Sequence, residues 1–214
     1  MPDVVTVEGP DAQTYLQGQI TQDVRPLAVG AVAWTFVLEP TGRAVALARL
    51  QRTADDRYEL VVDDGSGEAL LARLQRFKLR VKAELRLAAG VTEPVPGPTA
   101  AERVATGWPA MGREIVPGET IPAETGITAQ AVCFTKGCYT GQELVERMDS
   151  RQAAPPRRLV RVASAGADLA DGTELTLAGK VVGRVTTAAG RQALAYVQRS
   201  VTDASELDGG VTLA

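Results

Sequence analysis

The strongest constraint on the fold is a change of pattern at residues 151–156, a segment that ends in two prolines. After it, short apolar runs are separated by turns rich in glycine and aspartate, which predicts a series of short strands. The predicted strands lie at residues 159–162, 174–177, 180–187, 192–197 and 211–213. Strands this short and this closely spaced favour a small closed β-barrel. The segment at 151–156 is therefore predicted to be a linker between two domains.

Residues before this linker mix strand and helix patterns, which predicts an α+β fold. Helices are predicted from Asp11 to about Ile20 and from Ser66 to about Phe77, each with a polar residue at the N-cap. A turn at Glu39–Gly42 joins two strands as a hairpin, and the proline-rich residues 88–101 are predicted to be a linker or surface excursion. The predicted strands lie at 4–7, 31–38, 43–50, 58–62 and 79–87.

The octet Lys136-Gly137-Cys138-Tyr139-Thr140-Gly141-Gln142-Glu143 is the most distinctive stretch of the chain. It follows the apolar run 131–134, predicted as the end of a strand, and precedes a predicted helix on which Glu143 and Arg147 pair. Glycines at its bends predict a strand-to-helix turn, whose N–H groups and helix terminus favour negative charge. Cys138 would lie there beside Lys136, a setting in which thiols become nucleophilic. The alternative is a small buried cysteine in an ordinary tight turn.

The composition excludes several function classes. The 214 residues contain no histidine, which rules out Cys-His and Ser-His nucleophile pairs and His-containing metal sites. Two cysteines are too few for a disulfide framework, or for the four thiolates of an iron–sulfur cluster unless two subunits pool theirs, and we expect no resident metal. A net charge of −3 argues against a dedicated nucleic-acid binder, and no apolar run reaches the length of a membrane span. Without a secretion signal, the simplest interpretation is a cytoplasmic protein with reduced thiols.

The octet resembles, without a mismatch, the signature of the YgfZ-type folate-binding proteins, which are relatives of the glycine cleavage T-protein, an aminomethyltransferase. Further blocks resemble the same family and appear along the chain in the family's order. They lie at residues 11–24, 38–43, 74–80, 182–186 and 193–197. The resemblance implies a GcvT-like ring. In it, an amino-terminal region at 1–152 contains an inserted ferredoxin-like unit at about 32–87, and a β-barrel occupies 157–214.

The resemblance also implies a function. Such proteins bind tetrahydrofolate, which is the cofactor expected here. The family is linked to assembly or repair of iron–sulfur clusters in other proteins, so iron–sulfur client proteins are the expected partners. Cys138 matches the family's signature cysteine, which implies a functional thiol at that position.

One departure from the aminomethyltransferases concerns the strand after the hairpin turn. In those enzymes it carries an acidic residue needed for transfer to folate, whereas residues 43–49 contain no carboxylate. A carboxylate there would assist proton transfer at the folate nitrogen, so its absence argues against glycine-cleavage chemistry. Two alternatives stay open: a folate-dependent aminomethyltransferase and a non-catalytic folate-binding adaptor. Whether the chain is an enzyme is therefore open, a one-carbon transferase being the class that the resemblance suggests.

Folate chemistry indicates which side chains are candidates for binding. The adjacent N–H donors of a pterin suit a carboxylate or amide, its ring suits an aromatic wall, and its glutamate tail suits a cation. The candidates are Glu124, Gln17, Gln19 and Asp23 for the N–H donors, Trp108 and Tyr15 for the wall, Arg113, Lys136 and Arg147 for the tail, and Tyr139 and Gln142 within the octet.

Overall fold

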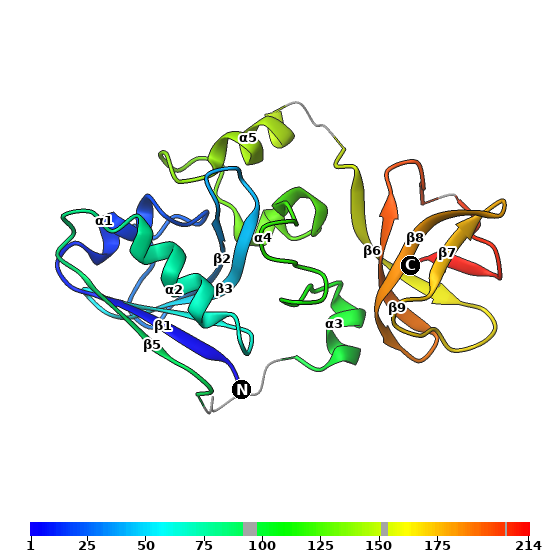
Figure 1. The fold of residues 1–214 in the computed structure, drawn as a ribbon, viewed down its shortest axis with the longest axis horizontal. Coiled ribbons are helices and arrows are strands. Elements are labelled where there is room, and N and C mark those ends of the chain that lie inside the picture. The colour runs from blue at the N-terminus through cyan, green and yellow to red at the C-terminus, as the bar shows by residue number, and fades with distance from the viewer. Residues whose placement is uncertain (92–97, 151–153, 204) are drawn as a thin grey trace. The chain divides into compact units, whose positions relative to one another are not determined.

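The structure, a computed structural model, describes residues 1–91, 98–150, 154–203 and 205–214 (Figure 1). The chain divides into two compact units. The first unit comprises Met1–Val95, Ala110–Pro122 and Ile127–Arg147, and the second comprises Pro96–Pro109, Ala123–Gly126 and Met148–Ala214. The domain bounds 1–152 and 157–214, and the inserted unit at about 32–87, stay predictions. Three residues of the predicted linker, 151–153, lie outside the described residues.

The first unit is built on an antiparallel sheet of five strands in the order β2-β3-β4-β1-β5. The strands are β1 (Asp3–Glu8), β2 (Val32–Leu38), β3 (Ala44–Ala54), β4 (Arg57–Val62) and β5 (Glu84–Ala88). The first strand of the chain lies inside the sheet, because β1 pairs with β4 on one side and with β5 on the other. Alternate residues of β1, Val5 and Val7, are fully buried, as expected for a strand with one face on a core.

Helix α2 (Gly67–Arg76) packs across this sheet, as the left part of Figure 1 shows, and buries Leu70 and Leu74. The carboxylate of Asp3 accepts the N–H of Gly67 at 2.9 Å, so the sheet satisfies the first turn of the helix. Ser66 lies at the predicted N-cap position, but its side chain makes no capping bond. The other helices that begin in this unit are α1 (Ala12–Gln17), α4 (Thr128–Ala131) and α5 (Gln142–Ser150).

The second unit contains an antiparallel sheet in the order β10-β6-β9-β8-β7. Its strands are β6 (Arg157–Ser164), β7 (Glu174–Leu177), β8 (Lys180–Ala189), β9 (Gln192–Gln198) and β10 (Val211–Leu213). Apolar residues of these strands form one core, and helix α3 (Ala100–Thr106) packs on β8 and β9. A short 3-10 helix, η1, spans Pro122–Glu124.

The two edge strands of this sheet are joined through Asp208. Its backbone N–H donates to the oxygen of Thr176 on β7 at 2.8 Å. Its carboxylate accepts the N–H groups of Ala178 at 3.1 Å and Gly179 at 2.8 Å. The described strands thus form a half-barrel. Strands β7 and β10 do not pair in a ladder, and the contact between the two edges is made by Asp208, which precedes β10.

Most predicted strands and the hairpin are confirmed with shifted ends, but three local predictions are wrong. The apolar run at 131–134 is no strand, because Ala131 ends α4 and the N–H of Cys133 bonds to the oxygen of Thr21 instead of a ladder. Helix α1 ends at Gln17 rather than Ile20. The strand predicted at 79–87 begins only at Glu84, because Arg80 has a φ of 56° that interrupts the extended backbone.

Candidate functional site

The octet packs against the hairpin turn through two glycines. Gly141 has a φ of 85°, and a β-carbon there would lie 2.5 Å from the oxygen of Glu39. Gly42 has a φ of 83°, and a β-carbon there would lie 2.5 Å from the β-carbon of Leu144. Both positions therefore need glycine for its backbone conformation and for space. The hairpin turn and the octet lie about a hundred residues apart in sequence. They are in close contact because neither glycine has a side chain at the point where the two segments meet.

Residues 18–22 hold the octet from another side. The N–H of Thr140 donates to the oxygen of Gly18 at 3.0 Å. Just before the octet, the hydroxyl of Thr21 donates to the oxygen of Ala131 at 2.6 Å, and the N–H of Cys133 donates to the oxygen of Thr21 at 3.0 Å. The octet, the hairpin turn and the loop after α1 therefore converge within the first unit.

We call the meeting point of these three segments the junction. The buried ammonium of Lys136 links two of them, the octet and the loop after α1. Its Nζ donates to the oxygens of Ile20 and Gln22, both at 2.8 Å, and lies 5.2 Å from the centre of the Tyr139 ring. Burial lowers the pKa of Lys136 to about 8, although the negative charges of Asp23 and Cys133 act in the opposite direction. The ammonium thus serves the loop that carries the octet, and its role toward a folate tail stays a prediction.

The two thiols lie in different surroundings. Cys138 is exposed, which excludes the alternative of a buried structural cysteine. Its predicted place at a helix N-terminus is wrong, because α5 begins only at Gln142. Cys133 is half-buried, with Sγ 3.5 Å from the Thr135 hydroxyl. That hydroxyl, together with the N–H groups of Thr135 and Lys136, lowers the pKa of Cys133 against the effect of partial burial.

Arg73 also contacts these segments, although it was not among the predicted site residues. Its guanidinium is buried, donates from Nε to the oxygen of Leu38 at 2.7 Å and from Nη1 to Oε1 of Gln19 at 3.0 Å, and leaves Nη2 without a hydrogen bond. It lies 4.2 Å from the centre of the Phe77 ring, and burial lowers its pKa. A signal was present, because Arg73 falls at helical spacing on the apolar face that includes Leu70.

Most other candidates of the first unit make internal contacts. Tyr15 is buried and donates to the oxygen of Leu74, and burial raises its pKa to about 12. Gln17 accepts the N–H of Val24 at 3.0 Å, but its buried Nε2 makes no hydrogen bond. Asp23 pairs with Arg25 at 3.0 Å, and that hydrogen bond lowers the pKa of Asp23 despite some desolvation.

The remaining octet residues frame the start of α5. Gln142 accepts the N–H of Tyr139 at 2.7 Å, and the buried hydroxyl of Tyr139 makes no hydrogen bond. Burial raises the pKa of Tyr139 to about 12. The predicted Glu143–Arg147 pair is confirmed at 2.7 Å, so Arg147 already has a carboxylate partner. Arg113 is exposed elsewhere in the same unit.

Glu124 and Trp108 belong to the second unit. Glu124 is buried, and its Oε2 lies 3.3 Å from Nη2 of Arg157 without forming a hydrogen bond. Arg157 in turn stacks 4.3 Å from the centre of the Tyr196 ring. Trp108 is half-buried, and its carbonyl accepts from Nη1 of Arg103 at 3.3 Å. Glu124 is therefore a buried carboxylate with an oxygen open to a further donor.

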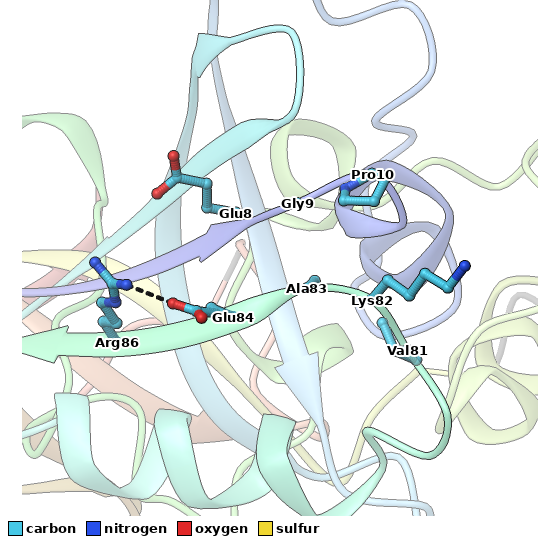
Figure 2. Close-up of a pocket in the computed structure, with 8 residues that line it drawn as sticks. All are labelled: Glu8, Gly9, Pro10, Val81, Lys82, Ala83, Glu84 and Arg86. Atoms are coloured by element: carbon cyan, nitrogen blue, oxygen red, sulfur yellow. Dashed lines mark hydrogen bonds and ion pairs between the residues drawn. The ribbon is translucent and has the colours of Figure 1, made fainter.

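An open hollow of about 530 Å³ lies elsewhere in the first unit, at the adjoining ends of β1 and β5 (Figure 2). It is lined by Glu8, Gly9, Pro10, Val81, Lys82, Ala83, Glu84 and Arg86. None of the candidate folate ligands lines it, so this hollow is separate from the junction around the octet. Among the described residues, no helix combines the length and apolarity needed to cross a membrane.

Sequence comparisons identify two domain families. Residues 3–134 match the GCVT N-terminal domain, and residues 157–212 match the CAF17 C-terminal beta-barrel domain. Among solved structures, the fold is similar to the glycine cleavage system aminomethyltransferase T from Bartonella henselae. That similarity has a TM-score of 0.83 at 17% identity and covers 99% of this chain and 81% of the other.

Three curated relatives have more specific names. An aminomethyltransferase from Nostoc is 28% identical over 90% of this chain and 47% of its own length. The human mitochondrial iron–sulfur cluster assembly factor IBA57 is 30% identical over 80% of this chain and 44% of its own length. The tRNA-modifying protein YgfZ from Vibrio vulnificus is 28% identical over 48% of this chain and 31% of its own length.

The chain thus spans less than half the length of these three relatives. The GCVT N-terminal domain nevertheless accounts for most of the chain, and the barrel family follows it in the order found in the sequence. The fold agrees with that assignment through the mixed first unit and the half-barrel of the second. This chain therefore belongs to the GcvT-like family, in the group with a CAF17-type barrel that includes YgfZ and IBA57.

Proposed function

We propose that this chain binds tetrahydrofolate and assists the assembly or repair of iron–sulfur clusters in client enzymes, with Cys138 as a functional thiol. The iron–sulfur role rests on the relatives named as iron–sulfur cluster assembly factors, of which human IBA57 is one. Cys138 is exposed in a loop fixed by backbone contacts on two sides, which suits a thiol that meets another molecule. A cytoplasmic location stays a prediction.

The observation that carries folate binding is the buried carboxylate of Glu124. Its Oε2 is shielded from water and pairs with Arg157 at 3.3 Å without forming a hydrogen bond, so it can still accept one from a further donor. The adjacent N–H groups of a pterin are donors of that kind. In this proposal Glu124 binds and orients the pterin, while folate, when bound, supplies a one-carbon carrier.

Calorimetric titration with tetrahydrofolate tests this assignment. We expect wild type to bind, and Glu124→Gln to bind about tenfold or more weakly, because the change removes a charge-assisted hydrogen bond at constant shape. Glu174→Gln is the matched control, because Glu174 is exposed and pairs with Arg184 on the same unit. No heat of binding with wild type, or equal affinity for Glu124→Gln, would contradict the proposal.

The thiol role is tested by complementation of a strain that lacks this protein. Cys138→Ala should fail to restore the activity of iron–sulfur enzymes while still binding folate. Cys133→Ala, which removes the other free thiol, should restore that activity and is the control. Full rescue by Cys138→Ala would exclude the thiol role and favour an adaptor that binds folate without chemistry.

A second candidate function is aminomethyl transfer, which the Nostoc relative supports because it aligns with 90% of this chain. The strand after the hairpin argues against it. Residues Ala44–Ala48 of β3 are all buried and apolar, so this part of the strand presents no carboxylate to assist proton transfer to folate. Folate-dependent release of ammonia from an aminomethyl-lipoyl carrier protein would establish the transferase; we expect none.

A further inference from the structure

The loop between α2 and β5 forms a basic surface on an otherwise acidic chain. Arg76, Lys78, Arg80 and Lys82 fall within seven residues that contain no carboxylate, whereas the chain as a whole has a net charge of −3. No ion pair links these four cations to a carboxylate in the part of the chain that the structure describes. We call residues 76–82 the basic loop. Its charge is available to a partner.

An apolar side chain stands in the middle of the basic loop. Leu79 is 79% exposed between Lys78 and Arg80, and Arg80 has a φ of 56°, a conformation that is uncommon for residues other than glycine. A strained backbone position such as Arg80 is a feature found at binding sites, and the neighbouring Leu79 side chain is accessible to a partner. The basic loop therefore offers both charge and an apolar contact.

The basic loop leads directly into the open hollow at β5. Lys82 and Val81 line the hollow together with Arg86, and Figure 2 shows Glu84 and Arg86 joined by an ion pair along β5. The floor is fixed, because the N–H of Lys82 donates to the carboxylate of Asp11 at 2.7 Å. A β-carbon on Gly9 would lie 2.5 Å from the oxygen of Lys82, so the two segments are in close backbone contact. The hollow is thus formed by well-anchored backbone.

The outer side of β5 is a sheet edge. Among the described strands β5 pairs with β1 alone and ends the order β2-β3-β4-β1-β5. An edge strand has backbone N–H and C=O groups that another extended polypeptide can pair with. A nucleic acid or lipid surface cannot use those groups in this way.

We propose that the basic loop and the β5 edge together bind an extended, acidic segment of a partner protein. Carboxylates of that segment would pair with the loop cations, an apolar residue would contact Leu79, and its backbone would add to β5. Because the rest of the chain is acidic, repulsion elsewhere would direct such a segment to this surface. This inference does not depend on folate binding or on the Cys138 thiol. Peptide binding can therefore fail while the proposed function holds, and the reverse is also possible.

The test uses a fluorescein-labelled twelve-residue peptide of alternating Glu and Val, with anisotropy as the measurement. We expect wild type to bind it, and the double variant Arg76→Glu/Lys82→Glu to bind about tenfold or more weakly, because two attractions become repulsions. Lys180→Glu, an exposed change on β8 in the second unit, should bind like wild type. Melting curves confirm that each variant is folded.

Three further measurements decide the class of partner. Hydrogen exchange should show new protection of β5 amides with the peptide bound, and Leu79→Ser should weaken binding several-fold. A peptide with Lys in place of Glu should not bind. The proposal is overturned if the double variant binds like wild type or if β5 gains no protection. It is also overturned if single-stranded RNA or vesicles of anionic lipid bind the basic loop and the acidic peptide does not.

Discussion

At the scale of single residues, Lys136 shows how one buried charge ties the octet to the rest of the first unit. Its ammonium donates to the oxygens of Ile20 and Gln22, and burial lowers its pKa to about 8 from an ordinary value of 10.5. The unfolded chain therefore keeps this proton at pH values where the folded chain has lost it. Within that range, folding becomes more favourable as the pH rises.

We predict that the free energy of unfolding rises between pH 8 and about 10, with a contribution from Lys136 of at most about 3 kcal/mol. Above pH 10 the trend should reverse, because burial raises the pKa of Tyr15 and Tyr139 to about 12 and only the unfolded phenols ionise. Urea unfolding of wild type and Lys136→Met at several pH values measures this. The Lys136→Met variant should show a smaller rise, because only the lowered pKa of the Cys133 thiol still contributes, and the exposed Lys180→Met should retain the full rise. An identical pH dependence in all three proteins would contradict the prediction.

The residue scale also shows a limit of reasoning from sequence. The spacing placed a reactive thiol at Cys138, yet the hydroxyl and amide donors that lower a thiol pKa surround Cys133. The lowered pKa of Cys133 was not expected, because residues 131–134 were predicted to be a strand. In a strand, backbone N–H groups bond to a neighbouring strand and do not surround a nearby thiol. Spacing alone left a buried and a functional Cys138 as alternatives, and the structure shows that this thiol is exposed.

At the scale of elements, local patterns predicted most strands, since period-two burial and turn residues are local signals. Helix α3 was missed although Thr99 and Glu102 form a capping box, because the preceding prolines favoured a linker. The strand predicted at 79–87 was too long, because alternation in sequence does not reveal the positive φ of Arg80. The contact between the hairpin turn and the octet was not predictable. The glycines of each segment are already accounted for by a local turn, so they gave no sign of a distant contact.

That contact gives a prediction at this scale. Gly141→Ala should lower the free energy of unfolding by about 2 kcal/mol or more, because the new methyl adds a clash with Glu39 to the strain of a positive φ. Gly65→Ala is the matched control, because Gly65 has a φ of 75° and no atom within 4 Å of the added carbon. It should cost about 1 kcal/mol. Equal losses in urea unfolding would show that the octet does not depend on its close contact with the hairpin turn.

At the scale of the whole molecule, the order of motifs along the chain was enough to predict the family, which the domain matches confirm. The grouping of residues into compact units was less accessible. Residues 98–109 and 123–126 group with the carboxy-terminal strands, because long-range contacts such as Arg103 with Thr187 at 3.1 Å hold them there. Such contacts join residues far apart in sequence and leave no periodic signal.

Charge is the other property of the whole molecule that follows from the sequence. The chain has no histidine, and ordinary carboxyl groups titrate near pH 4 whereas thiols, amines and phenols titrate from about pH 8 upward. Between pH 6 and 7 the net charge should therefore stay within about one unit of −3, and the free energy of unfolding should change by less than about 1 kcal/mol. Capillary electrophoresis and urea unfolding across this range measure both quantities. A step of a full charge near pH 6.5 would contradict the prediction, because it requires a carboxyl or thiol whose pKa is far from its usual range.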